Sequence, residues 1–269
     1  MQTSYSKVSI FILLVIYSFS SFAANEDQFK VRGLSAFNHE HSQLLESWLT
    51  FGVNATRATL GVYPTPLSLY VYPRKSNQPV PWAYTKRNGK GSVHFHVDPR
   101  FGLKKFVDDW TIYHELAHMA LPYLGSQYRW LSEGFASYMQ YQIMAQADVL
   151  QGTLSTRYQS QIAKHLRWFK SDLTAASIAK RLMNNNQYPA AYWGSAYFFI
   201  YAEQLLEKKH QTSLVALISY YQDCCRQHDN NLADVFASLD GILEDNLFAS
   251  LLNRFETEPA RNLYPESFN

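Results

Sequence analysis

The sequence predicts an α+β protein, with a small, mainly antiparallel sheet and paired helices followed by an all-helical carboxy-terminal half. Short alternating segments separated by Pro, Asn and Gly occupy residues 64–97, which is typical of strands. Apolar residues at helical spacing dominate from residue 108 onward. With 47% hydrophobic and 17% charged residues in 269, the composition is that of a folded protein rather than a disordered one.

Residues 1–23 have the pattern of a secretory signal peptide. Lys7 is the only charge, Val8–Phe19 is almost entirely apolar, and Ser21-Phe22-Ala23 places small residues before a cleavage site after Ala23. The alternative is an uncleaved anchor, but a run of about 12 residues is short for ~30 Å of hydrocarbon. We therefore expect an exported protein, periplasmic or secreted, with no stable membrane span after signal cleavage.

The mature chain begins with one helix and three strands. Apolar residues at Leu44, Leu45, Trp48 and Leu49 indicate a helix over residues 38–58. Residues 67–72 alternate and read as a strand that Pro73 ends. Residues 82–87 and 92–97 flank an Asn-Gly pair, which predicts a hairpin whose tip, residues 86–90, is solvated.

Helices dominate the remainder of the chain. Asp108 or Asp109 can cap a helix that runs to about Leu121, where Pro122 stops it, and a second helix follows over residues 130–147. Further helices are expected at 156–170, 174–183, 194–209, 212–227 and 242–256. A cleft between the sheet-containing half and the helical half is a natural place for a site.

Charge and cysteine content exclude several classes of protein. Lys plus Arg is 24 and Asp plus Glu is 22, so the balance predicts no nucleic-acid partner. Cys224 and Cys225 are the only cysteines, which excludes a disulfide framework and a Cys-based zinc site. Because adjacent cysteines can pair only in a strained ring, we expect free thiols.

The string His114-Glu115-Leu116-Ala117-His118 is the segment that indicates a catalytic metal site. Two histidines four residues apart lie on one helix face, so both imidazoles can reach one ion. Zinc binds imidazole nitrogen at about 2.0–2.1 Å. Glu115 lies beside such an ion rather than on it, where it can take a proton from an activated water and deliver it to a leaving amine.

Glu133 is the candidate for the third ligand that a catalytic zinc site needs. A class of enzymes with a third His six residues after the second is excluded, because Leu124 occupies that position. Glu133 instead follows Trp130-Leu131-Ser132 on the next expected helix, 15 residues after His118.

These two segments together resemble the gluzincin zinc metallopeptidases, most closely the catalytic core of the aminopeptidase N and thermolysin-like families. The resemblance implies a zincin-like fold, with His114, His118 and Glu133 as ligands of one Zn²⁺ ion and Glu115 as general base. The spacing departs from the aminopeptidase N pattern, because fewer residues separate His118 from Glu133. The segment that starts at Tyr192 resembles the family's Tyr-x-x-Gly helix, which implies that Tyr192 stabilises the oxyanion. Strict alignment on Gly194 places Ala191 there, so Tyr188 and Tyr197 remain alternatives.

Two features of the hairpin leave alternatives open. His94 and His96 share one strand face and could bind a metal, although a substrate-facing or merely exposed position is the simpler reading. The strand at residues 93–97 could pair with an extended peptide. The Gly-x-Met-x-Asn strand of the aminopeptidases is missing, so endopeptidase and exopeptidase action stay equally open.

The sequence therefore predicts an exported, zinc-dependent metallopeptidase that acts on peptides or proteins. Residues 24–147 would form the zincin-like unit and residues 148–269 a helical subdomain that closes the cleft. The alternatives are a non-catalytic zinc-containing binding module of the envelope, and a zinc hydrolase of a non-peptide substrate such as an amide or epoxide. The sequence does not determine the oligomeric state.

Overall fold

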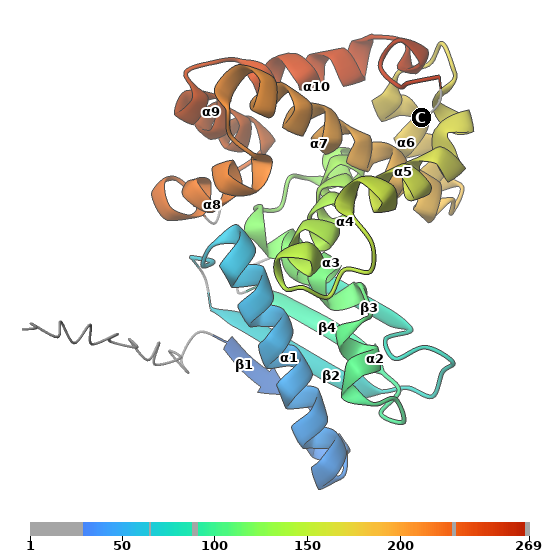
Figure 1. The fold of residues 1–269 in the computed structure, drawn as a ribbon, viewed down its shortest axis with the longest axis vertical. Coiled ribbons are helices and arrows are strands. Elements are labelled where there is room, and N and C mark those ends of the chain that lie inside the picture. Colours follow the sequence, from blue (N-terminus) through green and yellow to red (C-terminus); the bar gives the residue numbers. More distant parts are fainter. Residues whose placement is uncertain (1–28, 65, 88–90, 228–229, 267–269) are drawn as a thin grey trace, which may run out of the picture.

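A computed structural model describes residues 29–64, 66–87, 91–227 and 230–266 of the protein. The signal expected at residues 1–23 and the Asn88-Gly89 turn lie outside these residues. Figure 1 shows a small sheet with helices on one face and a larger helical body beyond one end of that layer. In the described part of the chain, no helix combines the length and apolar character needed to cross a membrane.

The architecture confirms a sheet-containing first half and a helical second half. The strands are β1 (Phe29–Arg32), β2 (Leu67–Pro73), β3 (Trp82–Lys86) and β4 (Ser92–Val97). The α-helices are α1 (His39–Leu60), α2 (Leu103–Val107), α3 (Thr111–Ala117), α4 (Arg129–Gln146), α5 (Leu154–His165), α6 (Ala175–Asn184), α7 (Tyr188–His210), α8 (Leu214–Cys224), α9 (Leu232–Leu243) and α10 (Leu247–Thr257). Short 3₁₀ segments occupy Leu34–Ala36, His118–Ala120, Ser126–Tyr128, Leu166–Phe169 and Ala260–Asn262.

The sheet has the strand order β1-β2-β4-β3, and the prediction of a mainly antiparallel sheet is wrong. β1 pairs with β2 and β2 pairs with β4 in parallel, whereas only β3 and β4 form the predicted antiparallel pair. The long helix α1 returns the chain across the sheet after β1, so β2 runs in the same direction as β1. The second strand of the hairpin, β4, pairs with β2, so its first strand, β3, lies at the edge of the sheet.

This order also corrects the expected peptide-binding strand. β4 has neighbours on both sides, so residues 93–97 have no free edge for an extended peptide. The edge strands of the described sheet are β1 and β3. The four-residue strand β1 was not predicted, because so short a segment has little periodicity of its own.

Aromatic packing joins the sheet to the helices that cover it. The ring of Trp48 on α1 lies 5.1 Å from that of Phe95 on β4 and 5.0 Å from that of Phe106 on α2, measured between ring centroids. All three side chains are fully buried and belong to a core that continues into the helical half. This packing holds the helices after β4 in a fixed position against the sheet.

Several helix boundaries differ from those predicted. The helix expected from Asp108 or Asp109 to about Leu121 corresponds to α3, which begins at Thr111 and tightens into a 3₁₀ turn at His118–Ala120, and the short helix α2 before it was not predicted. The N-cap of α3 is Trp110 and not either of the predicted aspartates, although the side chain of Asp109 accepts a hydrogen bond from the Thr111 amide at 2.8 Å. Helix α9 was not predicted, and α7 begins at Tyr188 instead of residue 194, with Pro189 in its first turn.

The prediction of free thiols is also wrong. Cys224 and Cys225 form a disulfide at the carboxyl end of α8. The prediction rested on the expected strain of a ring between adjacent cysteines, which does not exclude the bond here.

Candidate metal centre

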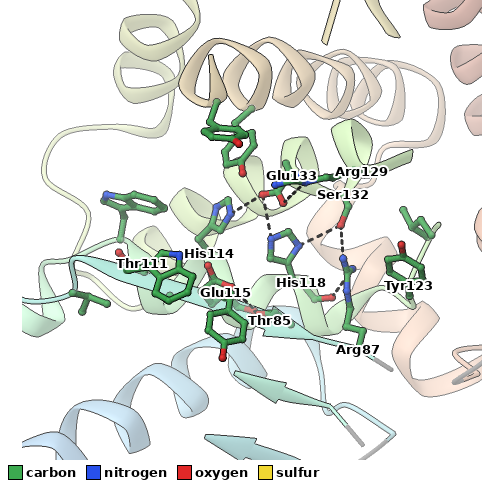
Figure 2. Close-up of a pocket in the computed structure, with 18 of the residues that line it drawn as sticks. Thr85, Arg87, Thr111, His114, Glu115, His118, Tyr123, Arg129, Ser132 and Glu133 are labelled. Atoms are coloured by element: carbon green, nitrogen blue, oxygen red, sulfur yellow. Dashed lines mark hydrogen bonds and ion pairs between the residues drawn. The ribbon is translucent and has the colours of Figure 1, made fainter. Parts of the chain in front are cut away.

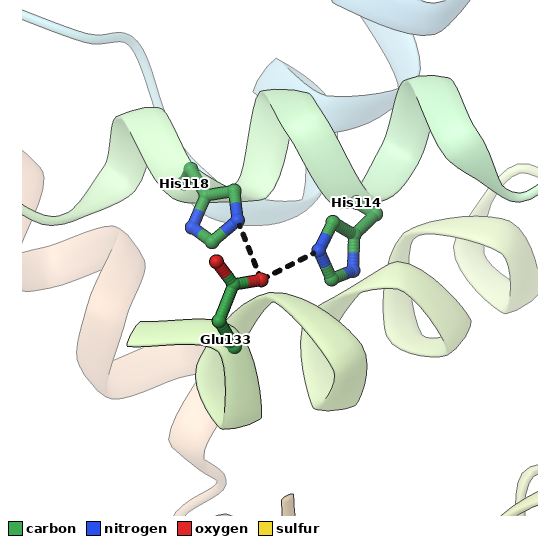
Figure 3. Close-up of side chains that lie close together, drawn as sticks. All are labelled: His114, His118 and Glu133. Carbon is green, nitrogen blue, oxygen red and sulfur yellow. Dashed lines mark hydrogen bonds and ion pairs between the residues drawn. The ribbon is translucent and has the colours of Figure 1, made fainter. Parts of the chain in front are cut away.

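Three side chains that the sequence singles out converge at one point (Figure 3). His114 lies on α3, His118 begins the next turn, and Glu133 lies on α4. Oε2 of Glu133 is 3.3 Å from Nε2 of His114 and 3.4 Å from Nε2 of His118. The three possible ligand atoms all lie within 4.8 Å of one another, so this group could hold a metal ion.

A close helix contact sets the position of Glu133. A Cβ atom added to the next residue, Gly134, would lie 2.6 Å from the backbone carbonyl carbon of Ser195 on α7. Only glycine permits α4 and α7 to approach so closely. This approach fixes Glu133 between α3 and α7.

The second nitrogen of each imidazole has its own partner. Nδ1 of His114 is 3.0 Å from Oε1 of Gln140, and Nδ1 of His118 is 3.3 Å from the Ser132 hydroxyl. The Gln140 oxygen can only accept, so in this arrangement Nδ1 of His114 carries the proton. The lone pair of Nε2 then faces a carboxylate oxygen of Glu133, and two acceptors in this position suit a bridging cation.

Burial and the charge of Glu133 shift the pKa values of the three side chains in different directions. Burial lowers the pKa of His118 to about 4, which keeps its imidazole neutral near pH 7. Burial also acts to lower the pKa of His114, but the hydrogen bond and charge of Glu133 outweigh it and the pKa is raised. Burial acts to raise the pKa of Glu133, yet the two imidazoles reverse this and hold it well below its usual range. Glu133 is therefore an anion that faces two nitrogen ligands.

Glu115 lies in the same cavity, outside the group of three. Its carboxylate is buried, and Oε2 accepts a hydrogen bond from the Thr85 hydroxyl at 2.8 Å. Burial raises the pKa of Glu115, which suits a group that takes up and releases a proton. Thr85 lies on β3, directly beside Glu115 (Figure 2), and no sequence motif pointed to it.

Arg87 corrects the expectation of a solvated hairpin tip. Its guanidinium donates to the carbonyl oxygens of His118 at 3.2 Å and Pro122 at 3.4 Å, and to the Ser132 hydroxyl at 2.9 Å. Burial lowers the pKa of this guanidinium. Arg87 thus holds the end of the histidine-bearing turn, and it also contacts the serine beside the second histidine.

Two of the three candidate tyrosines reach the cavity. Tyr188 and Tyr192 both line it, because they lie one turn apart in the first turns of α7. The Tyr192 ring stacks 6.1 Å from that of His114, and burial raises the pKa of its hydroxyl, which Arg129 opposes. Tyr197 lies elsewhere, with its ring 4.5 Å from that of Tyr264.

His94 and His96 lie on the outer face of the sheet. Both nitrogens of His94 have partners, the Tyr72 hydroxyl and the Ser92 hydroxyl, each at 3.1 Å. The ring stacks between those of Tyr70 and Tyr84. Among the described residues, no metal-binding group includes either histidine.

The cavity has a volume of about 760 Å³ and lies between β3, α3 and the amino-terminal ends of α4 and α7. It brings together His114, Glu115, His118, Glu133 and Tyr192, the five site residues that the sequence predicts. No protein-family model matches the chain, and a comparison with curated proteins finds no match.

Proposed function

We propose that the protein is an exported zinc-dependent metallopeptidase of gluzincin type, with a zincin-like fold. One observation carries the proposal: a buried carboxylate, Glu115, shares a cavity with a two-histidine, one-glutamate group. A purely structural metal site has no use for such an additional carboxylate. Export is inferred from the pattern of residues 1–23.

The donor set fits zinc. Bonds of about 2.0–2.1 Å in a tetrahedron place neighbouring ligand atoms about 3.3 Å apart. The Glu133 oxygen is 3.3 and 3.4 Å from the two histidine nitrogens, which agrees with that separation. Three protein ligands leave one position open, as catalytic sites require.

Zinc held by His114, His118 and Glu133 would supply a Lewis acid that polarises the scissile carbonyl and makes water more acidic. Glu115 takes the proton from the attacking water and passes it to the leaving amine. The Tyr192 hydroxyl donates a hydrogen bond to the oxyanion as it develops. The free edge of β3, which lines the cavity, pairs with the extended backbone of the peptide or protein substrate.

The test is digestion of a mixed peptide library by zinc-loaded protein, read by mass spectrometry. The Glu115→Gln variant should cleave about 10²–10⁴-fold more slowly, with its zinc retained. Full activity of this variant would refute the mechanism. If the protein binds zinc but cleaves no peptide, the alternatives gain support, namely a zinc-containing binding module or a hydrolase of a non-peptide substrate.

A further inference from the structure

The carboxylates that line the cavity already have partners. Asp109 accepts from the Thr111 amide, Glu115 accepts from Thr85, and Glu133 faces the two imidazoles. Among the described lining residues there are no other acidic side chains. Each carboxylate of the cavity is thus engaged by at least one neighbouring group.

The two arginines of the cavity differ in how many of their N–H donors already have hydrogen-bond partners. The Arg87 guanidinium donates hydrogen bonds to the carbonyl oxygens of His118 and Pro122 and to the hydroxyl of Ser132. The Arg129 side chain is 55% exposed, and its Nε lies 3.9 Å from Oε1 of Glu133, which is too long for a hydrogen bond. It also interacts with the hydroxyl of Tyr192. A guanidinium has five N–H donors, so Arg129 keeps several for a ligand.

The position of Arg129 is set by the helix that carries Glu133. The two residues are four apart on α4, so both side chains lie on one face (Figure 2). The guanidinium is centred 5.8 Å from the Tyr188 ring, which restrains it at the mouth of the cavity. An anionic group held there would lie next to the proposed zinc site.

We propose that Arg129 binds a carboxylate of the substrate close to the scissile bond. This inference rests on the proposed peptidase function and names the class of substrate. The carboxylate can come from the free carboxyl terminus of a peptide or from an Asp or Glu side chain. The guanidinium matches either one in a two-point hydrogen-bonded pair.

Three matched peptide libraries separate these sources. The first has free carboxyl termini and no Asp or Glu, the second has the same sequences amidated, and the third is amidated with Asp or Glu included. Preferred cleavage of the first library assigns the terminal carboxylate, and preferred cleavage of the third assigns an acidic side chain. Equal cleavage of all three would overturn the inference while leaving the peptidase proposal intact. If none of the three libraries is cleaved, the result contradicts the peptidase proposal and, because it rests on that proposal, the inference about Arg129 as well.

Binding provides a readout that does not depend on turnover. Calorimetry with the zinc-loaded Glu115→Gln protein should give about 10- to 100-fold weaker binding when the preferred carboxylate becomes an amide. In a Glu115→Gln/Arg129→Gln protein the two forms of the peptide should bind alike, and Arg129→Lys should restore part of the difference. Arg181→Gln is the matched control, because Arg181 lies exposed on α6 and away from the cavity.

Two further outcomes would count against the inference. If Arg129→Gln weakens the acid and amide forms equally, the side chain acts on the peptide backbone or the oxyanion and not on a carboxylate. If the variant loses its zinc, Arg129 acts through Glu133. Zinc content is therefore measured for each variant, and it should equal that of the parent protein.

Discussion

The hydroxyl of Thr85 donates a hydrogen bond at 2.8 Å to Oε2 of Glu115. This contact joins the edge strand of the sheet to the helix that carries His114. The same hydroxyl lies 2.9 Å from the backbone oxygen of Glu115, and together these contacts orient the carboxylate, which lines the cavity. We take the bond to Oε2 as the contact that orients the proposed general base.

Thr85→Val should move the pH dependence of peptide cleavage. The bond from Thr85 favours the charged carboxylate and lowers the pKa of Glu115, so its loss raises that pKa. Less of the base form is then present on the acid side, and the acid limb of kcat/KM moves to higher pH. We expect about a 10-fold loss near neutral pH from one charged hydrogen bond. Thr85→Ser, which keeps the hydroxyl, should retain the parent profile; an unchanged profile for Thr85→Val would disprove the role.

Arg87→Met should destabilise the fold and weaken metal binding. The variant leaves the His118 and Pro122 carbonyls without their donor, so we expect the free energy of unfolding in urea to fall by about 2–4 kcal/mol. Lys86→Met is the matched control, because the Lys86 side chain is exposed and lies over the Tyr84 ring, away from the histidine-bearing turn. Equal stability of the two variants would show that Arg87 is dispensable.

Gln140→Leu should weaken zinc binding without changing the ligands. Gln140 holds Nδ1 of His114 and thereby the tautomer that presents Nε2. Loss of such a partner typically costs about 10–100-fold in metal affinity. Competition with a chromophoric chelator measures this affinity, and Gln146→Leu on the exposed side of α4 should bind zinc as the parent does. If Gln140→Leu binds zinc as tightly as the parent protein does, Gln140 is not needed to hold the tautomer of His114.

Gly134→Ala should separate the two helices that frame the cavity. The new methyl group would meet the backbone of Ser195, which cannot move without shifting α7. We expect a loss of about 1–3 kcal/mol in unfolding free energy. Gly241→Ala is the control, since no atom lies within 4 Å of the added Cβ on α9. In Gly241→Ala the free energy of unfolding should rise by about 0.5–1 kcal/mol. A change of the same sign in both variants would contradict the role given to Gly134.

Tyr192→Phe should lower kcat for peptide cleavage by about 10²–10³-fold, as expected for loss of one oxyanion donor. Tyr188→Phe should have a smaller effect, because the Tyr188 hydroxyl is bound to Asn186 at 2.8 Å and its ring is exposed. Steady-state kinetics on a peptide from the library measures both. The reverse order of effects would assign the role to Tyr188.

Local spacing was enough to predict the core of the candidate site. Two histidines four residues apart must share a helix face, and the structure places His114 and His118 there even though the second lies in a 3₁₀ turn. The position of Glu133 followed from the resemblance of its segment, and the structure brings it to both imidazoles. The division into a small sheet and a helical half also followed from periodicity.

Other features depend on contacts between distant parts of the chain. The hairpin at residues 82–97 was visible in the sequence, but its placement against β2 was not, so the parallel pairing and the free edge of β3 were missed. Thr85 and Arg87 have no motif, because their partners lie 30 and 31 residues away in the sequence. That Tyr188 and Tyr192 line the cavity while Tyr197 does not likewise depends on the start of α7.

The amino-acid order alone thus determined that His114 and His118 can share one metal ion, because helical periodicity acts over a few residues. The tertiary structure decided which strands lie at the edges of the sheet, which donor holds Glu115 and which cation remains available at the mouth of the cavity. Those outcomes depend on how whole elements pack against one another, and the sequence specifies that packing only through the collective burial of the core.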